Sequence, residues 1–194
     1  NLKHLRLERF SVDILPYIPA MKNLESLNTF FILSFPRDGA NLLKISESCK
    51  KLMNVGITLK LGDTTTKVLK LFLHNLPKLE SLSIRFEGED NDILYSKEWN
   101  EFPELFNNLK PLKKLNLVGV CQQAPRVLQE ILTNLDANKL EELDLHASNE
   151  VPELCIYASI AKILGKFERL SVLELCFYEI RDVEEKHMIN FFSS

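Results

Sequence analysis

The residues that could do chemistry in this chain of 194 residues do not form a known catalytic or metal-binding motif. The four histidines form no H-E-x-x-H pair, and the sequence contains no G-x-S-x-G nucleophile segment and no glycine-rich phosphate loop. Catalysis requires a nucleophile, a base and a charge-stabilising group that converge on one point. The sequence therefore predicts no enzyme activity, no metal and no cofactor.

The acidic segment 87–92 is the one stretch whose composition suggests calcium. A calcium-binding loop needs oxygen ligands at alternate positions, a central glycine and a closing glutamate. Gly88 comes too early for that pattern, so we expect a hydrated connecting loop. Tyr95 and Trp99 follow in the same connection and are candidate partner-binding residues, because aromatic side chains are enriched at interface hot spots. The alternative is that both side chains fold back and fill their own loop.

Composition and charge narrow the classes of partner. The net charge is −3 and the Lys and Arg residues are scattered, without the basic stripe typical of nucleic-acid binding. No run of about 18 apolar residues that could span a membrane occurs. The four cysteines form no C-x-x-C pair and no zinc spacing, and the chain has no Asn-x-Ser/Thr sequon. We therefore expect a protein partner, no nucleic acid, no membrane, and a cytoplasmic or nuclear location.

The elements that would position any binding residues come from a three-position, mostly apolar pattern that occurs seven times. The seven segments are Leu2-Leu5-Leu7, Leu24-Leu27-Thr29, Leu52-Val55-Ile57, Leu79-Leu82-Ile84, Leu112-Leu115-Leu117, Leu140-Leu143-Leu145 and Leu170-Leu173-Leu175. Their first leucines lie 22, 28, 27, 33, 28 and 30 residues apart. Such a period is typical of a solenoid, in which neighbouring units stack because none can bury its apolar face alone.

Each segment fits a short strand, with alternate side chains on opposite faces. Apolar residues at helical spacing precede the third to seventh segments, which predicts an α/β fold with a parallel sheet and helices on one side of it. The second segment departs from the pattern, because Thr29 stands in the third position and three apolar residues, 30–32, follow it. We expect a bulge or a slipped register at that point.

These residues resemble the leucine-rich repeat superfamily, in which L-x-x-L-x-L is the core of each unit. The resemblance covers nearly the whole chain and implies a leucine-rich-repeat solenoid, or horseshoe, with a concave parallel sheet, convex helices and about seven repeats. It implies a single domain over residues 1–194, which we expect to be a fragment of a longer protein because no polar terminal cap is visible. The units are long, like those of the intracellular classes, and they lack the usual Asn of the fuller motif.

Two intracellular families are similar to this chain. Residues 48–57 resemble the cysteine-containing repeats of F-box proteins, in which a helix-ending cysteine, here Cys49, stands three residues before the strand leucine. That resemblance implies capture of substrates for a cullin-based ubiquitin ligase, although the F-box helices themselves are not recognisable here. The other family is the leucine-rich-repeat region of nucleotide-binding immune receptors, which implies ligand sensing or autoinhibition. A structural scaffold remains a third alternative, with contacts through the convex helices and the apolar segment Met188 to Phe192, which lies in an expected final helix over 182–192.

The residues between the strand leucines should line the concave face, where they would capture a partner or another domain of the same chain. The polar candidates among them are Arg6, Glu8, Asn28, Asn54, Arg85, Lys114, Asn116, Glu142, Asp144, His146 and Glu174. Adjacent strands lie about 4.8 Å apart, so Glu142, Asp144 and Glu174 would share one patch that accepts a basic segment. An ordinary hydrated face is the alternative. Cys176 also falls on this face, and with no base expected beside it, we interpret it as a small neutral filler.

Overall fold

The computed structural model describes residues 1–7, 12–33, 38–59, 65–86, 101–109, 111–120, 124–147 and 160–177. Their strands form one seven-stranded sheet whose spatial order follows the chain, and every neighbouring pair is parallel. The strands are β1 (His4–Leu7), β2 (Ser26–Leu33), β3 (Asn54–Leu59), β4 (Ser81–Phe86), β5 (Lys114–Val120), β6 (Glu142–Ala147) and β7 (Val172–Phe177). The predicted α/β class and parallel sheet are confirmed.

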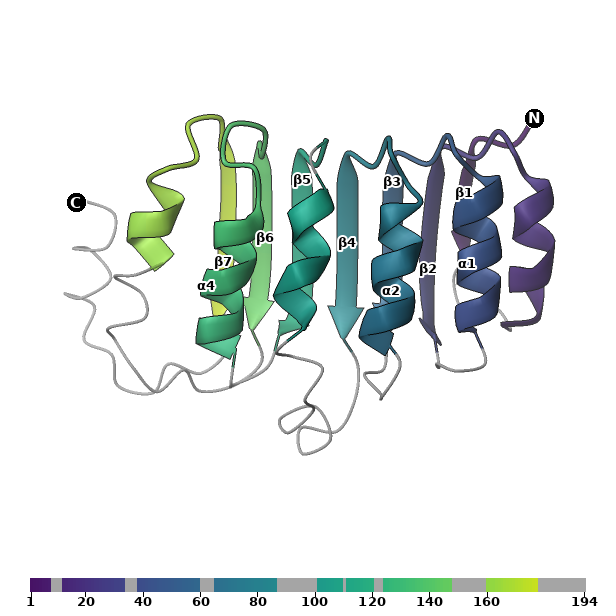
Figure 1. Ribbon diagram of the computed structural model, residues 1–194, viewed down its shortest axis with the longest axis horizontal. Coiled ribbons are helices and arrows are strands. Elements are labelled where there is room, and N and C mark those ends of the chain that lie inside the picture. Colours follow the sequence, from purple (N-terminus) through teal and green to yellow (C-terminus); the bar gives the residue numbers. More distant parts are fainter. Residues whose placement is uncertain are drawn as a thin grey trace.

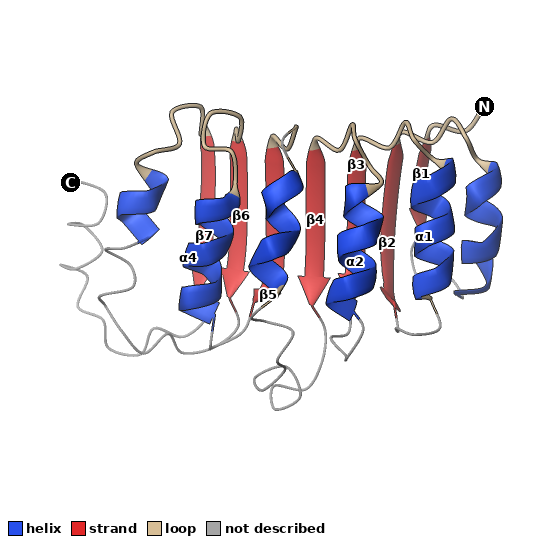
Figure 2. Cartoon of the chain, viewed as in Figure 1, coloured by secondary structure: helices blue, strands red, loops and turns tan. Residues whose placement is uncertain are grey.

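The described helices form one layer over a single face of this sheet (Figures 1 and 2). They are η1 (Val12–Ala20), α1 (Gly39–Ser48), α2 (Thr65–His74), η3 (Phe102–Asn108) and α4 (Ala124–Asn134), and residues 160–164 are also helical. Each helix packs beside the one before it, from η1 through α1, α2 and η3 to α4. Successive strands and successive helices are therefore neighbours in both layers.

A repeated pair of backbone hydrogen bonds fixes the register where each strand begins. The carbonyl of Lys3 accepts the N–H groups of Glu25 and Ser26, at 2.7 and 2.9 Å. The same two-donor arrangement recurs at the carbonyls of Glu25, Met53, Glu80, Lys113 and Glu141. Because every junction has the same geometry, equivalent residues of the seven segments lie side by side across the sheet.

The strand leucines point toward the helices and share one hydrophobic core. In the central strands they are almost fully covered, as for Leu82 and Leu115 at 1% exposed and Leu143 at 0%. Burial decreases at the two ends of the described sheet, where Leu2 is 47% and Leu173 is 37% exposed. The prediction that the spaced leucines face one apolar interior is confirmed for the described segments, except at Leu2 and Leu173, which are exposed.

The helix η1 was not predicted from the sequence. Its two prolines, Pro16 and Pro19, interrupt α-helical hydrogen bonding, and the segment adopts the tighter 3₁₀ form. Leu15 and Ile18 are three residues apart, which places both on one side of a helix with three residues per turn. Both side chains are fully buried against the core, so η1 covers the N-terminal part of the sheet although it lacks the expected 3.6-residue period.

The irregularity expected in the second segment is confirmed. The pairing of β2 with β3 shifts between Asn28 and Ile32, and Thr29 lies buried at this point. The Thr29 hydroxyl donates to the carbonyl of Gly56 at 3.4 Å, and the Thr58 hydroxyl donates to the carbonyl of Thr29 at 3.4 Å. A polar residue is accommodated in the core because these bonds satisfy it.

A second bulge, which was not predicted, interrupts β5. Gly119 has φ of 79° and is the extra residue between Val118, which pairs with His146, and Val120, which pairs with Ala147. A glycine with positive φ is the usual extra residue of such a bulge. A side chain there would also collide with the carbonyl oxygen of Phe86, at 2.5 Å from the added carbon.

Cys49 ends α1, as the resemblance implied, and its side chain is fully buried. The thiol donates toward the carbonyls of Ile18 and Met21, at 3.7 and 3.6 Å. Both acceptors belong to η1 and the turn after it, so the thiol joins one unit to the next. Burial raises the pKa of Cys49 and keeps the thiol protonated.

Several predictions concern residues outside the described ranges. They are Glu8, the acidic segment 87–92, Tyr95, Trp99 and the expected helix over 182–192. Within the described ranges, the structure contains no helix of sufficient length and apolarity to cross a membrane.

Candidate functional site

One face of the sheet carries no described helix, and we call it the open face. The strand register arranges its side chains in three rows. The first row is His4, Ser26, Asn54, Ser81, Lys114, Glu142 and Val172; the second is Arg6, Asn28, Gly56, Ser83, Asn116, Asp144 and Glu174; the third is Thr58, Arg85, Val118, His146 and Cys176. Every predicted strand residue that the structure describes therefore lies on this face.

The N-terminal part of the open face carries cations and amides. Arg6 and Arg85 are exposed, whereas Asn28 and Asn54 are half-buried. The side chain of Asn28 lies directly over Gly56, where an added Cβ would collide with the Asn28 amide oxygen. The glycine thus allows an amide from the neighbouring strand to lie flat across the sheet.

The C-terminal part of the open face divides into two charged groups. Lys114 and Glu142 are neighbours in the first row, and their Nζ and Oε1 atoms are 2.6 Å apart in an exposed ion pair. This pair corrects the expectation of one patch of three carboxylates, because Lys114 neutralises Glu142. Asp144 and Glu174 lie in the next row, which leaves them in a separate group with His146.

We call this group the His146 cluster; it comprises Asn116, Asp144, His146, Glu174 and Cys176. The Asn116 amide donates to Oδ2 of Asp144 at 2.7 Å. The His146 Nε2 atom lies 2.7 Å from Oδ1 of Asp144 and 3.9 Å from Oε1 of Glu174. The Cys176 thiol donates toward Oε1 of Glu174 at 3.6 Å. Three neighbouring strands, β5, β6 and β7, position the five side chains.

Burial within the cluster decreases toward β7. The side chains of His146 and Asp144 are 23% and 26% exposed, whereas that of Glu174 is 59% exposed. Oδ1 of Asp144 is itself buried, and it accepts no aligned hydrogen bond among the described residues despite its short contact with His146. The inner carboxylate is therefore fixed by Asn116, and the outer one is accessible from the open face.

The environment of Cys176 differs from what the sequence predicted. His146 is its register partner in β6, so the expectation that no base lies beside this thiol was wrong. Desolvation, the hydrogen bond to Glu174 and the negative charges of Glu174 and Asp144 raise the pKa of Cys176. A protonated thiol is a poor nucleophile, so this arrangement weighs against covalent catalysis by Cys176. His146 and Cys176 occupy the same position in consecutive segments, and this signal could have identified the pair.

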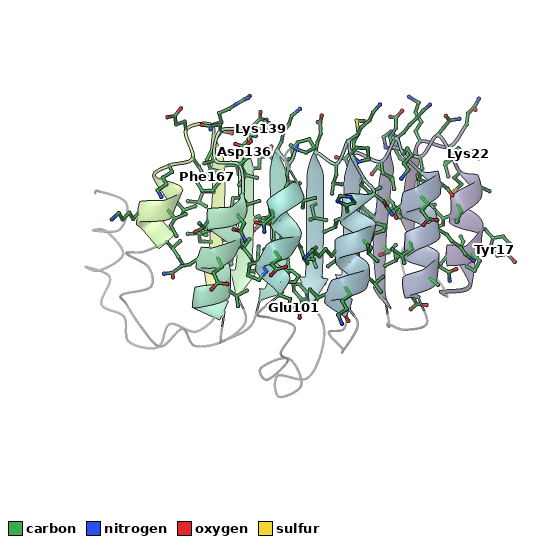
Figure 3. The ribbon with its side chains drawn as sticks, in the orientation of Figure 1. Tyr17, Lys22, Glu101, Asp136, Lys139 and Phe167 are labelled. Atoms are coloured by element: carbon green, nitrogen blue, oxygen red, sulfur yellow. The ribbon has the colours of Figure 1, made fainter. Side chains whose placement is uncertain are left out.

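A row of ion pairs follows the edge at which the strands begin. Lys3 pairs with Glu25 at 2.9 Å, Lys113 with Glu80 at 2.9 Å, and Arg169 with Glu141 at 2.7 Å. Figure 3 shows Lys22, Asp136 and Lys139 at this same edge and Glu101 at the opposite one. Exposed ion pairs of this kind contribute little to stability. We interpret them as contacts that align neighbouring segments, and we do not include them in the candidate site.

Comparison of the chain with protein-family models and with curated proteins finds no match.

Proposed function

We propose that this chain is a leucine-rich repeat domain whose concave face captures a protein partner. The observation that carries the proposal is the alignment of the polar residues between the strand leucines in rows on the open face. In a solenoid whose helices cover one face of the sheet, the side chains on the other face are available for contact. The recurrent junction hydrogen bonds support a solenoid of equivalent units.

The role of this domain is binding and not catalysis. The raised pKa of Cys176 keeps the thiol beside His146 protonated, which weighs against its use as a nucleophile. The polar rows extend across seven strands, which suits an extended polypeptide better than a small substrate.

The partner contacts the C-terminal part of the face with a basic segment. Lys114 neutralises Glu142, so Asp144 and Glu174 provide the acidic character there, with Glu174 the more exposed at 59%. Exposed charges of this kind steer association and fix orientation more than they add affinity. Arg6 and Arg85 lie on strands nearer the N-terminus and would orient a partner whose charge changes along its length.

Substrate capture for a ubiquitin ligase in the cytoplasm or nucleus is our first candidate for the parent protein. Cys49 favours it, because the helix-ending thiol bonds to the preceding unit as a structural element of the cysteine-containing repeats would. The described cysteines Cys49 and Cys176 are free thiols, in keeping with a reducing compartment. Ligand sensing or autoinhibition in an immune receptor is the second candidate.

A matched pair of charge reversals tests the binding face. Glu174→Lys alters the open face, whereas Glu104→Lys alters η3 in the helix layer at a side chain of similar exposure, 59% against 56%. Proteins retained by the wild-type chain from a cytosolic extract should be lost or weakened by Glu174→Lys and retained by Glu104→Lys. Equal retention by both variants would refute binding at this end of the face. Cullin adaptors among the retained proteins would favour the ligase candidate.

A further inference from the structure

The His146 cluster brings a nitrogen, an oxygen and a sulfur atom, each able to bind a metal ion, close together. A ring nitrogen of His146, a carboxylate oxygen of Glu174 and the sulfur of Cys176 all lie within 4.8 Å of one another. Strand geometry explains the meeting, because Glu174 and Cys176 are alternate residues on one face of β7 and His146 is the register partner of Cys176. Nitrogen, oxygen and thiolate sulfur are the donors that zinc takes in proteins.

Asp144 places a carboxylate beside one of these three donors, the ring of His146. Its Oδ1 atom is 2.7 Å from Nε2 of His146, yet it is buried and accepts no aligned hydrogen bond from the described residues. The Asn116 amide binds the other oxygen, Oδ2, and holds the carboxylate in this orientation. Oδ1 is thus a buried oxygen without a hydrogen-bond partner among the described residues, and a cation bound beside His146 would satisfy it.

We propose that His146, Glu174 and Cys176 bind a Zn²⁺ ion on the open face, and that the Asp144 carboxylate beside His146 moves in as the fourth ligand. Zinc bonds of about 2.0–2.3 Å in a tetrahedron separate neighbouring donor atoms by about 3.3–3.6 Å. The sulfur of Cys176 and Oε1 of Glu174 already lie 3.6 Å apart. The 3.9 Å gap between Glu174 and His146 must close and the 2.7 Å contact between Asp144 and His146 must open, and small side-chain rotations on the open face achieve both.

The donor set selects among cations. Calcium and magnesium prefer oxygen ligands alone, whereas imidazole and thiolate favour zinc and neighbouring transition metals. Binding replaces the thiol proton of Cys176 by the metal and releases that proton to solvent. The proposed site differs from the sequence prediction of no metal, which considered spacing along the chain and not the register that joins residues 144–146 to residues 174–176. It does not depend on the proposed capture of a protein partner, since the four ligands belong to this chain.

Titration of the full chain with Zn²⁺ alone, and with Co²⁺ as a spectroscopic probe, tests the site. We expect one ion per chain and, for cobalt, a thiolate-to-metal charge-transfer band that disappears in Cys176→Ser. His146→Asn and Cys176→Ser should each weaken zinc binding by at least about tenfold, and Asn116→Ala, which frees the Asp144 carboxylate, by roughly tenfold. Glu142→Gln is the matched control, because this acidic residue of β6 pairs with Lys114 outside the cluster.

The outcomes separate the proposed site from binding elsewhere. A cobalt thiolate band that persists in Cys176→Ser would place the metal on another cysteine and overturn the proposal. Zinc affinity that is unchanged in both His146→Asn and Cys176→Ser would overturn it as well. Far-ultraviolet circular dichroism identifies any variant that fails to fold, and Cys176→Ser, at a half-exposed position of β7, then provides the decisive comparison.

Discussion

Replacing Leu115 by alanine should destabilise the protein far more than the same replacement at the equivalent Leu173. Leu115 is 1% exposed in β5, and truncation removes three carbons from a closed core. At about 0.8 kcal/mol for each methylene the transfer contribution is roughly 2.4 kcal/mol. The cavity left behind raises the expected decrease in the free energy of unfolding to about 3–4 kcal/mol. Leu173 occupies the same position of β7 but is 37% exposed, so we expect a loss of roughly 1.5 kcal/mol because water can fill the space.

Urea unfolding of the two variants and the wild-type chain measures these losses as shifts of the midpoint at a common m value. The two substitutions are chemically identical and differ only in burial, so the comparison isolates packing. Equal losses, or a greater loss for Leu173→Ala, would refute the conclusion that the middle strands provide the main core.

Three further substitutions test individual contacts. Gly119→Ala should lower the free energy of unfolding by about 1–3 kcal/mol, because the backbone there has φ of 79°. The control Gly165→Ala, at a glycine with only ordinary contacts, should change it by less than about 0.5 kcal/mol. Thermal unfolding compares the two variants. Cys49→Ala should cost about 1–2 kcal/mol by the same measurement, because it removes a buried thiol and its contacts with two carbonyls, and an unchanged melting temperature would contradict that role. In the wild-type chain the Glu174 carboxylate disfavours the Cys176 thiolate, so Glu174→Gln should lower the pKa of Cys176 and speed its alkylation at about pH 8. Peptide mapping measures the alkylation, and slower alkylation of the variant would contradict this assignment.

The sheet could be predicted from the sequence because its period is local. Leu82 and Leu115 occupy the same position in their segments. Because the backbone hydrogen bonds at the start of each strand are the same, residues at the same position in two segments become register partners in the sheet. η1 escaped prediction because its prolines remove the α-helical period on which the interpretation relied. The bulge at Gly119 escaped because one extra residue in a strand leaves no mark on the spacing of the leucines.

The candidate site was predicted less completely than the sheet. The register placed Glu142, Asp144 and Glu174 on the same face, as expected, but the sequence does not reveal which charges neutralise one another. The pairing of Lys114 with Glu142 depends on side-chain conformation across two strands, at 2.6 Å. The cluster around Cys176 joins residues of three strands, so motif searches along the chain could not find it.

Methyl-to-methyl nuclear Overhauser effects in a leucine- and valine-labelled sample test most directly whether the segments share one core in chain order. The structure predicts an unbroken series of contacts between methyl groups of register partners from Leu27 and Val55 through Leu82 and Leu115 to Leu143. Two unconnected sets of methyl contacts, or contacts that skip a strand, would contradict the shared core and remove the basis for the open face.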